Sequence, residues 1–466
     1  MPLRLAVLSV LLALVPTSAR AQELSLQEML LRVKPAVVVV VAEVGAEITL
    51  RCGGADKTVT PTPYRESGSG FFVSPRGWIV TNAHVVYVGQ EPPVRWMTTH
   101  LVEKAFRADC LPDILARRGL APGARPDLED SLARDAVAAT PSDRVKLAPG
   151  VSVVLQNGLR LAAKIAKYSP PPVGEAMSGR DLALLRVEAA DMPILSLGDS
   201  GRLQIGDRLS VIGFPGVVMT HELLNASAKA QASVTHGSVS GFKQDRGNQP
   251  IIQTDAAAEA GTSGGPTVDT GGRVVGVMTA VTQGEGGAVQ GFNFVIPVAA
   301  VKEFLSGTTV ALDETSRFNT AWNAGLSAFF AGRYTTAAPH LTEANRLLPE
   351  MADVQRISME NAARVKTQPL LPWTQVGVGL VVVSAAGYAA LLAVRWRRNR
   401  FRISPSEVAR LLEGTDPPAL LDVRETSAFE SSPVRIPRSV RMSVQEVSDG
   451  KRPDIDQARM IVAYCT

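Results

Sequence analysis

Three short segments of this 466-residue sequence carry residue types that suit nucleophilic catalysis. His84 follows an apolar run that begins at Trp78, Asp181 opens the apolar run 182–187, and Ser263 lies among glycines. A serine hydroxyl is a poor nucleophile unless a base removes its proton and a third group holds that base in the correct tautomer. The three residues predict a set in which Ser263 attacks, His84 takes the proton and Asp181 orients His84.

The segment around Ser263 also suits the stabilisation of negative charge. It reads Gly261-Thr262-Ser263-Gly264-Gly265. Glycines permit a tight turn that points backbone N–H groups inward. The N–H groups of Gly261 and Ser263 can therefore form an oxyanion hole. Each residue alone is more often structural, so the prediction depends on the three segments occurring together and in the order His, Asp, Ser.

The elements that must position these residues read as β-strands. Between Ala36 and Pro297 the chain consists of short β-branched and aromatic runs broken by Gly, Pro, Asn and Asp, for example 36–41, 70–73 and 274–277. This spacing predicts an all-β barrel or sandwich. A strand then delivers His84 at its end, and Asp181 lies at the start of another strand, at the sheet edge.

These segments resemble the trypsin-like serine peptidases, and most closely their bacterial HtrA (Deg) branch. The resemblance covers roughly Leu24 to Leu305 and implies an all-β double β-barrel with the three residues in the cleft between the barrels. It implies protein or peptide substrates, no metal, no organic cofactor, and a fold that allows a homo-oligomer. The supporting segments are Gly68–Phe71, Gly198–Ser200, Ile212–Pro215, Gly237–Gly241, Gln253–Ala256 and Gly291–Pro297. The other histidines lack such flanks and are interpreted as surface or core residues.

Two positions near the nucleophile depart from that pattern. Thr262 stands where relatives usually have Asn or Asp, and a β-branched residue there predicts a strained turn or a rearrangement before catalysis. Ala257 stands where the family often has the floor of the primary pocket. Without a carboxylate at that position, we expect small or medium apolar residues before the cut.

A helical insertion at about 90–147 separates His84 from Asp181 by far more residues than in HtrA relatives. Its segment 96–106 has the pattern of an amphipathic helix. Two interpretations stay open: the insertion shapes the cleft, or it is a tolerated surface addition. Cys52 and Cys110 lie on the same side of the membrane in the arrangement given below, so an oxidising compartment would allow a disulfide that attaches the insertion to the barrel.

Residues 1–21 and the run 376–394 have membrane-targeting features. Residues 1–21 read as a signal peptide, with Arg4, an apolar run and a small-x-small site at Ala19-Arg20-Ala21. The alternative is an uncleaved anchor.

The apolar run 376–394 has no charged residue and is long enough, at about 28 Å, to be a transmembrane helix. Five arginines between Arg395 and Arg402 follow it, which places that end in the cytoplasm. We therefore expect a single-pass inner-membrane protein with a periplasmic protease domain and a cytoplasmic C-terminus. The alternative is a buried core helix.

The segment 316–366 shows one tetratricopeptide-like (TPR-like) α-helical hairpin where many HtrA relatives carry a PDZ module. Because a single repeat cannot bury its own face, it must pack on the barrel, on the following helix or on a protein partner. The alternative is a plain helical spacer. The residues at repeat spacing are Gly325, Gly332, Tyr334, Ala337, Leu341, Ala344 and Pro349.

The segment 403–466 resembles an incomplete α/β rhodanese-like domain. Its apolar strands 420–424 and 460–465 match that family, and Cys465 stands at the place of the reactive cysteine. The loop and helix that lower the pKa of such a cysteine would follow Thr466, so the segment as it stands is truncated and not expected to transfer sulfur. The alternatives are a partner-dependent tail, a decayed domain, or a reading frame interrupted at a selenocysteine codon.

Composition narrows the functional classes. Lys and Arg number 48 against 44 Asp and Glu, and the only dense basic run is the one after residue 394, so nucleic acid is an unlikely ligand class by charge. Three cysteines exclude a disulfide-dense scaffold and a zinc-ribbon set. The sequence therefore predicts an exported, membrane-anchored serine endopeptidase acting on envelope or misfolded proteins. The alternatives are a catalytically silent protease fold that binds partners, and a sulfurtransferase.

Overall fold

A computed structural model describes residues 24–172, 178–284, 287–312, 314–367, 373–456 and 458–465. The predicted signal peptide at 1–21 lies outside the described residues. The chain divides into two compact units, Met1–Gln368 and Pro369–Thr466. Each unit is described by itself.

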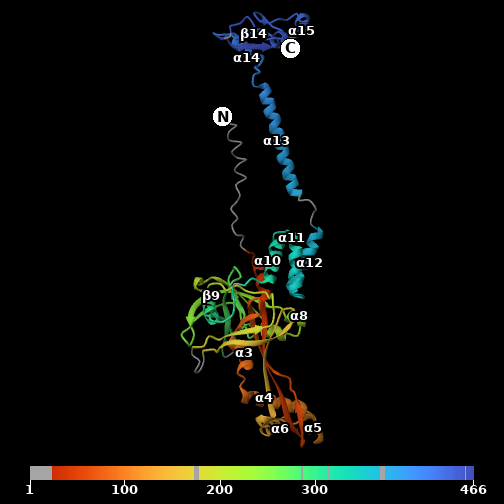
Figure 1. Ribbon diagram of the computed structural model, residues 1–466, viewed down its shortest axis with the longest axis vertical. Coiled ribbons are helices and arrows are strands. Elements are labelled where there is room, and N and C mark those ends of the chain that lie inside the picture. The colour runs from red at the N-terminus through yellow and green to blue at the C-terminus, as the bar shows by residue number, and fades with distance from the viewer. Residues whose placement is uncertain are drawn as a thin grey trace. The chain divides into compact units, whose positions relative to one another are not determined.

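The first unit contains two closed β-barrels (Figure 1), which confirms the predicted double-barrel fold. In the first barrel six antiparallel strands close on themselves because the first strand pairs with both β3 and β5. Its interior is filled by β-branched and aromatic side chains such as Val38, Phe72 and Ile79, which favour extended backbone. The strands are β1 (Val37–Cys52), β3 (Tyr64–Ser74), β4 (Trp78–Thr81), β7 (Leu182–Val187), β6 (Arg160–Ser169) and β5 (Val145–Val154).

The second barrel also has six strands, and a separate apolar layer joins it to the first. Val39 and Phe71 of the first barrel pack with Ile212 and Val277 of the second. Helix α9 (Val298–Leu305) follows the last strand and buries Val301 in the same layer. The strands are β10 (Pro250–Thr254), β13 (Gly287–Pro297), β12 (Val274–Gly284), β11 (Pro266–Val268), β8 (Arg208–Gly213) and β9 (Ser233–Gln244).

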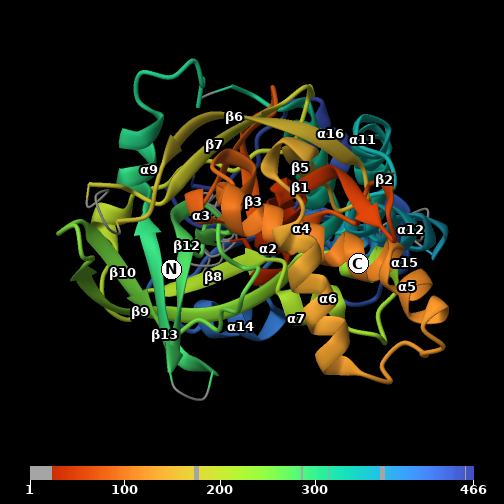
Figure 2. The same ribbon diagram turned by 90° about the horizontal axis from the view of Figure 1, so that it is seen from below.

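The insertion forms a helical subdomain on an extended hairpin (Figures 1 and 2). The second half of β1 continues beyond the barrel and pairs with β2 (Ala55–Val59) and β5. The predicted helix at 96–106 lies within α4, whose Met97, Leu101 and Ala105 are buried. A disulfide joins Cys52, at the end of β1, to Cys110, at the end of α4, with a Cα–Cα distance of 5.2 Å. The helices are α4 (Val94–Asp109), α5 (Leu111–Arg117) and α6 (Pro126–Ala138).

The helical segment after the barrels packs on the N-terminal helix α2 (Leu26–Val33). Trp322 is fully buried and its indole N–H donates to the carbonyl of Leu31 at 2.7 Å. Lys34 forms an ion pair of 2.7 Å with Asp353. The face that a single hairpin leaves open is therefore covered within the chain, by α2 and by the following helix. The helices are α10 (Arg317–Phe330), α11 (Tyr334–Leu347) and α12 (Ala352–Thr367).

The second unit begins with helix α13 (Trp373–Asn399). Its segment Val376–Asn399 is long and apolar enough to cross a membrane: an 18-residue window within it has a mean hydropathy of 2.1, and no part of that window is buried. A parallel sheet of three strands follows, in the order β15-β14-β16. Strands β14 and β16 overlap the segments 420–424 and 460–465, which were predicted as strands. The remaining elements are α14 (Pro405–Leu412), β14 (Ala419–Asp422), α15 (Thr426–Ser431), β15 (Val440–Arg441), α16 (Val444–Ser448) and β16 (Ile461–Tyr464).

Candidate active site

His84 lies in the first turn of α3 (Ala83–Gln90), directly after β4. Asn82 precedes the helix and is fully buried. Its side-chain amide donates to the carbonyl of Asp181 at 2.9 Å. The end of β4 and the buried Asn82 amide thus fix the position of the His84 side chain at the edge of the first barrel.

Asp181 lies immediately before β7 with a φ of +50°, in the left-handed region that aspartate tolerates better than most residues. Its backbone N–H donates to Pro170 at 3.0 Å, and the residue is 6% exposed. The carboxylate accepts three donors: the His84 backbone N–H at 3.0 Å, the His84 Nδ1 at 2.8 Å, and the Thr279 hydroxyl. With these partners the carboxylate fixes the imidazole as the tautomer whose Nε2 can accept a proton.

The electrostatics of His84 follow from this contact. Burial lowers the pKa of the imidazole, but the hydrogen bond and the charge of Asp181, together with the charge of Glu66, outweigh burial and raise the pKa above its ordinary value of 6.5. An imidazole with a raised pKa is a stronger base for a serine proton.

The turn before Ser263 presents two backbone donors. Gly261 has a φ of +99°, and a Cβ there would lie 2.5 Å from the carbonyl oxygen of Phe214, so only glycine fits. The Thr262 hydroxyl donates to the carbonyl of Glu259 at 2.6 Å, and Thr262 is not among the residues with positive φ. In the part of the chain that the structure describes, the N–H groups of Gly261 and Ser263 have no acceptor. Both can therefore donate to a developing oxyanion.

The Ser263 hydroxyl donates to the carbonyl of Thr279 at 3.2 Å. Among the described residues it has no hydrogen bond to His84. Contacts between a catalytic serine and its base are commonly loose before substrate binds.

Three polar residues that support this site were not identified from the sequence. Thr279, in β12, contacts Asp181 and Ser263, and Asn82 fixes the backbone of Asp181. Ser69 in β3 donates its N–H to Ser263 O at 2.8 Å and its hydroxyl to Gly261 O at 2.7 Å. Asn82 and Ser69 lie inside segments that the sequence analysis had already selected. Their position in those segments was the signal that could have identified them as site residues. Thr279 follows an apolar run with nothing to mark it.

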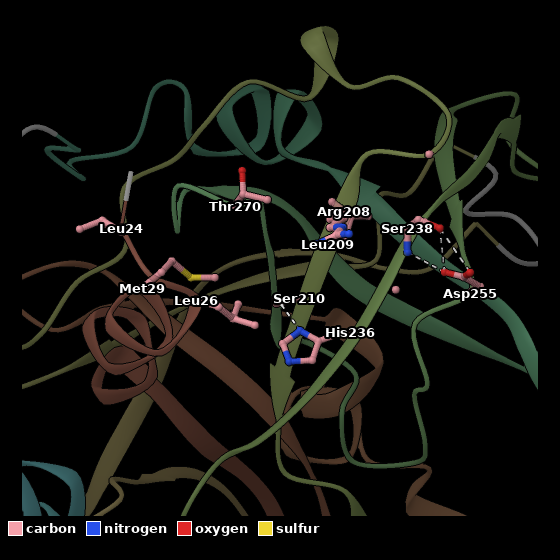
Figure 3. Close-up of a pocket in the computed structure, with 12 residues that line it drawn as sticks. Leu24, Leu26, Met29, Arg208, Leu209, Ser210, His236, Ser238, Asp255 and Thr270 are labelled. Carbon is pink, nitrogen blue, oxygen red and sulfur yellow. Dashed lines mark hydrogen bonds between the residues drawn. The ribbon is translucent and has the colours of Figure 1, made fainter. Parts of the chain in front are cut away.

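A second serine–histidine contact lies in a hollow on the second barrel, of about 670 Å³ (Figure 3). There Ser210 Oγ is 3.0 Å from Nδ1 of His236, while Asp255 bonds Ser238 instead. Among the described residues no carboxylate orients His236, and Ser210 lies within β8 and not in a turn with free N–H groups. This pair lacks the parts that activate a nucleophile. The residues that line it are Leu24, Leu26, Met29, Gly206, Arg208, Leu209, Ser210, His236, Gly237, Ser238, Asp255 and Thr270.

The remaining candidate residue, Cys465, belongs to the second unit. Cys465 follows β16 in the second unit and is an exposed free thiol. In that unit Asp422 and Arg424 form a buried ion pair of 2.7 Å, and the Arg424 guanidinium holds the pKa of the Asp422 carboxyl well below its usual range. No group of three His, Cys, Asp or Glu side chains that could hold a metal occurs in the described residues.

Comparison with known families agrees with a trypsin-like peptidase fold for the two barrels. Residues 68–277 match the model of the trypsin-like peptidase domain. This stretch contains His84, Asp181 and Ser263.

The chain is similar to curated proteins named probable periplasmic serine endoprotease DegP-like. The relative from Chlamydia trachomatis is 34% identical over 159 residues, which is 33% of this chain and 28% of the relative. The relative from Bartonella henselae is 36% identical over 33% of this chain and 27% of the relative, and that from Brucella suis 31% over 40% and 35%. The chain thus spans about a third or less of the length of these relatives.

Solved structures to which the chain shows similarity include the HtrA-type protease AlgW with a tripeptide and with a decapeptide. The first has a TM-score of 0.35 and 21% identity over 60% of this chain and 62% of the other. The second has a TM-score of 0.36 and 22% identity over 61% of this chain and 67% of the other.

Proposed function

We propose that this protein is a serine endopeptidase in which Ser263 attacks the peptide carbonyl and His84 is the general base. The observation that carries the proposal is the buried Asp181 carboxylate held on His84 Nδ1 at 2.8 Å, together with a turn at Ser263 in which two N–H groups have no acceptor among the described residues. Asp181 orients the imidazole, and the N–H groups of Gly261 and Ser263 stabilise the tetrahedral intermediate. His84 then gives its proton to the leaving amine.

The second part of the proposal is that the protease unit is exported and held at a membrane by α13. The Cys52–Cys110 disulfide supports an oxidising compartment. The uncharged apolar run 376–394 in α13 and the arginines after it support one span with a cytoplasmic C-terminus. The relatives named as periplasmic endoproteases support the same compartment. Envelope proteins with exposed extended segments are the substrates that we propose.

Labelling with a fluorophosphonate probe tests the catalytic proposal. We expect the full-length protein in detergent to be labelled and the Ser263→Ala variant to be unlabelled, because the probe traps only an activated serine. Ser210→Ala is the matched control: it removes the hydroxyl that contacts His236 and should keep full labelling. An unlabelled wild-type protein, or labelling that persists in Ser263→Ala, would overturn the assignment.

Compartment and topology are tested separately in intact cells. A membrane-impermeant maleimide should reach Cys465 only after the cytoplasmic membrane is opened, since Cys465 is the exposed free thiol of the second unit. Reaction of Cys465 in intact spheroplasts would place the second unit outside and reverse the proposed topology.

A further inference from the structure

One face of strand β3 leads from the insertion to the nucleophile. Side chains two apart in a strand share a face, so Tyr64, Glu66 and Gly68 point the same way. At Gly68 that face meets the site, because a Cβ there would lie 2.6 Å from the side chain of Val85 and 2.9 Å from Ser263 O. Glu66 therefore lies on the face of β3 that borders the site, roughly 7 Å along the strand from Gly68.

The insertion adds an aromatic wall beside Glu66. Trp96 and His100, one turn apart in α4, are stacked with ring centroids 5.1 Å apart, and Tyr64 stands edge-on to both at 5.2 and 5.5 Å. Trp96 is 49% exposed although it is the largest side chain of this group. His100 and Tyr64 cover part of its indole, and the exposed part is open to a ligand.

The Glu66 carboxylate lacks a basic partner. Its hydrogen-bond donor is the Tyr64 hydroxyl at 2.9 Å, and in the part of the chain that the structure describes no Lys or Arg forms an ion pair with it. The neighbouring Arg65 faces away and pairs with Glu43 at 2.8 Å. A partly buried carboxylate beside an exposed indole can bind a cation. The carboxylate supplies a charge-assisted hydrogen bond, and the ring face supplies a cation–π contact.

We propose that Glu66 and Trp96 bind a basic side chain of the substrate on the leaving-group side of the scissile bond. The inference rests on the proposed endopeptidase function. His84 must reach the leaving amine to protonate it, so the residues after the cut leave along the side of the site where the imidazole lies. Glu66 is on that side, since Gly68, two residues further along the same face of β3, borders Val85, the residue that follows His84. The insertion is thereby a specificity element, and Lys or Arg in the first two positions after the cut is the preferred chemistry.

A peptide library digested by the full-length protein in detergent tests this. Cleavages should be enriched in Lys or Arg within two residues after the cut. A well-cleaved peptide and its copy with that basic residue replaced by glutamine then give a discrimination ratio in kcat/KM. We expect a ratio of about ten for the wild type, because a hydrogen bond to a charged group contributes on this scale.

Three variants test which residues produce this discrimination ratio. Glu66→Gln should reduce it to about one, and Trp96→Ala should reduce it about threefold through loss of the ring face. Asp113→Asn, which removes an exposed carboxylate of α5 elsewhere on the insertion, should leave it unchanged. Using the ratio within each variant cancels any common change in His84 basicity.

Two outcomes separate this inference from the catalytic one. Wild-type protein that is labelled by fluorophosphonate but gives a ratio of one, or a Glu66→Gln variant that keeps the wild-type ratio, overturns the basic-residue site and leaves the peptidase standing. Wild-type protein that is neither labelled nor cleaves the library overturns both.

Discussion

Replacing Asp181 by asparagine tests how the carboxylate acts on His84. Asparagine tolerates the left-handed backbone at φ +50° nearly as well as aspartate, so the chain should keep its path. The amide, however, faces donors at both oxygen positions. An NH2 group at Oδ1 meets the His84 backbone N–H, which cannot reverse its role. An NH2 group at Oδ2 meets His84 Nδ1 and the Thr279 hydroxyl, which can both become acceptors.

The orientation with the NH2 group at Oδ2 is therefore favoured, and it holds His84 in the tautomer that cannot act as the base. With Nδ1 accepting, the imidazole proton lies on Nε2, which then cannot take the proton of Ser263. A fall in kcat of about 10⁴-fold is expected for this change in a serine–histidine–aspartate set, equivalent to about 5 kcal/mol in activation free energy.

The pH dependence of the activity tests the role of Asp181 independently, through the direction in which the pH profile moves. Activity needs neutral His84, so it rises with pH through the pKa of this residue. In the wild type that pKa is raised above 6.5, which places the acid limb above pH 6.5. Without the charge of Asp181 the lowering effect of burial is left opposed only by Glu66, and the limb should move to lower pH.

The assay is the second-order rate of fluorophosphonate labelling between pH 5 and 9. Asp191→Asn is the matched control, because Asp191 also has positive φ, at +57°, but pairs with Arg317 away from the site. A rate within tenfold of wild type, or an acid limb that stays in place or moves upward in Asp181→Asn, would refute the argument.

Three further changes test other parts of the structure. Thr279→Val removes the hydroxyl that donates to Asp181, and kcat/KM should fall about ten- to a hundredfold, while Thr279→Ser should restore most of it. Gly261→Ala places a Cβ 2.5 Å from the carbonyl of Phe214, so the turn must move, and labelling should fall at least a hundredfold. Replacing both Cys52 and Cys110 by alanine opens a link across 58 positions and should lower the stability of the insertion by about 2–4 kcal/mol in urea unfolding while Ser263 stays reactive.

For each of these three changes, one result would contradict the prediction. Equal activity of the valine and serine variants at position 279 would show that the hydroxyl does not act on the carboxylate. Full labelling of Gly261→Ala would show that the turn does not form the oxyanion hole. An unchanged unfolding curve without the disulfide would show that the helices hold to the hairpin by apolar contacts alone.

The β-strand pattern and the nucleophilic residues could be predicted because their signals are local. Runs such as 36–41 and 274–277 favour extended backbone through β-branched side chains, and they correspond to strands of the two barrels. The helix at 96–106 could be predicted from its apolar spacing, and it lies within α4. His84, Asp181 and Ser263 were prominent because each stands in a distinctive short segment.

Only the tertiary structure decided how these segments work together. Thr279 reaches Asp181 because β12 of the second barrel closes against the first, and no local pattern marks a threonine for that contact. Glu66 lies near an aromatic wall because a strand and an insertion helix, separated in sequence, meet at Tyr64, two residues before Glu66. The chain by itself determines which backbone each segment prefers and which functional groups it carries. Distances between those groups depend on barrel closure, which is a property of strand pairing over long sequence separations and not of any one segment.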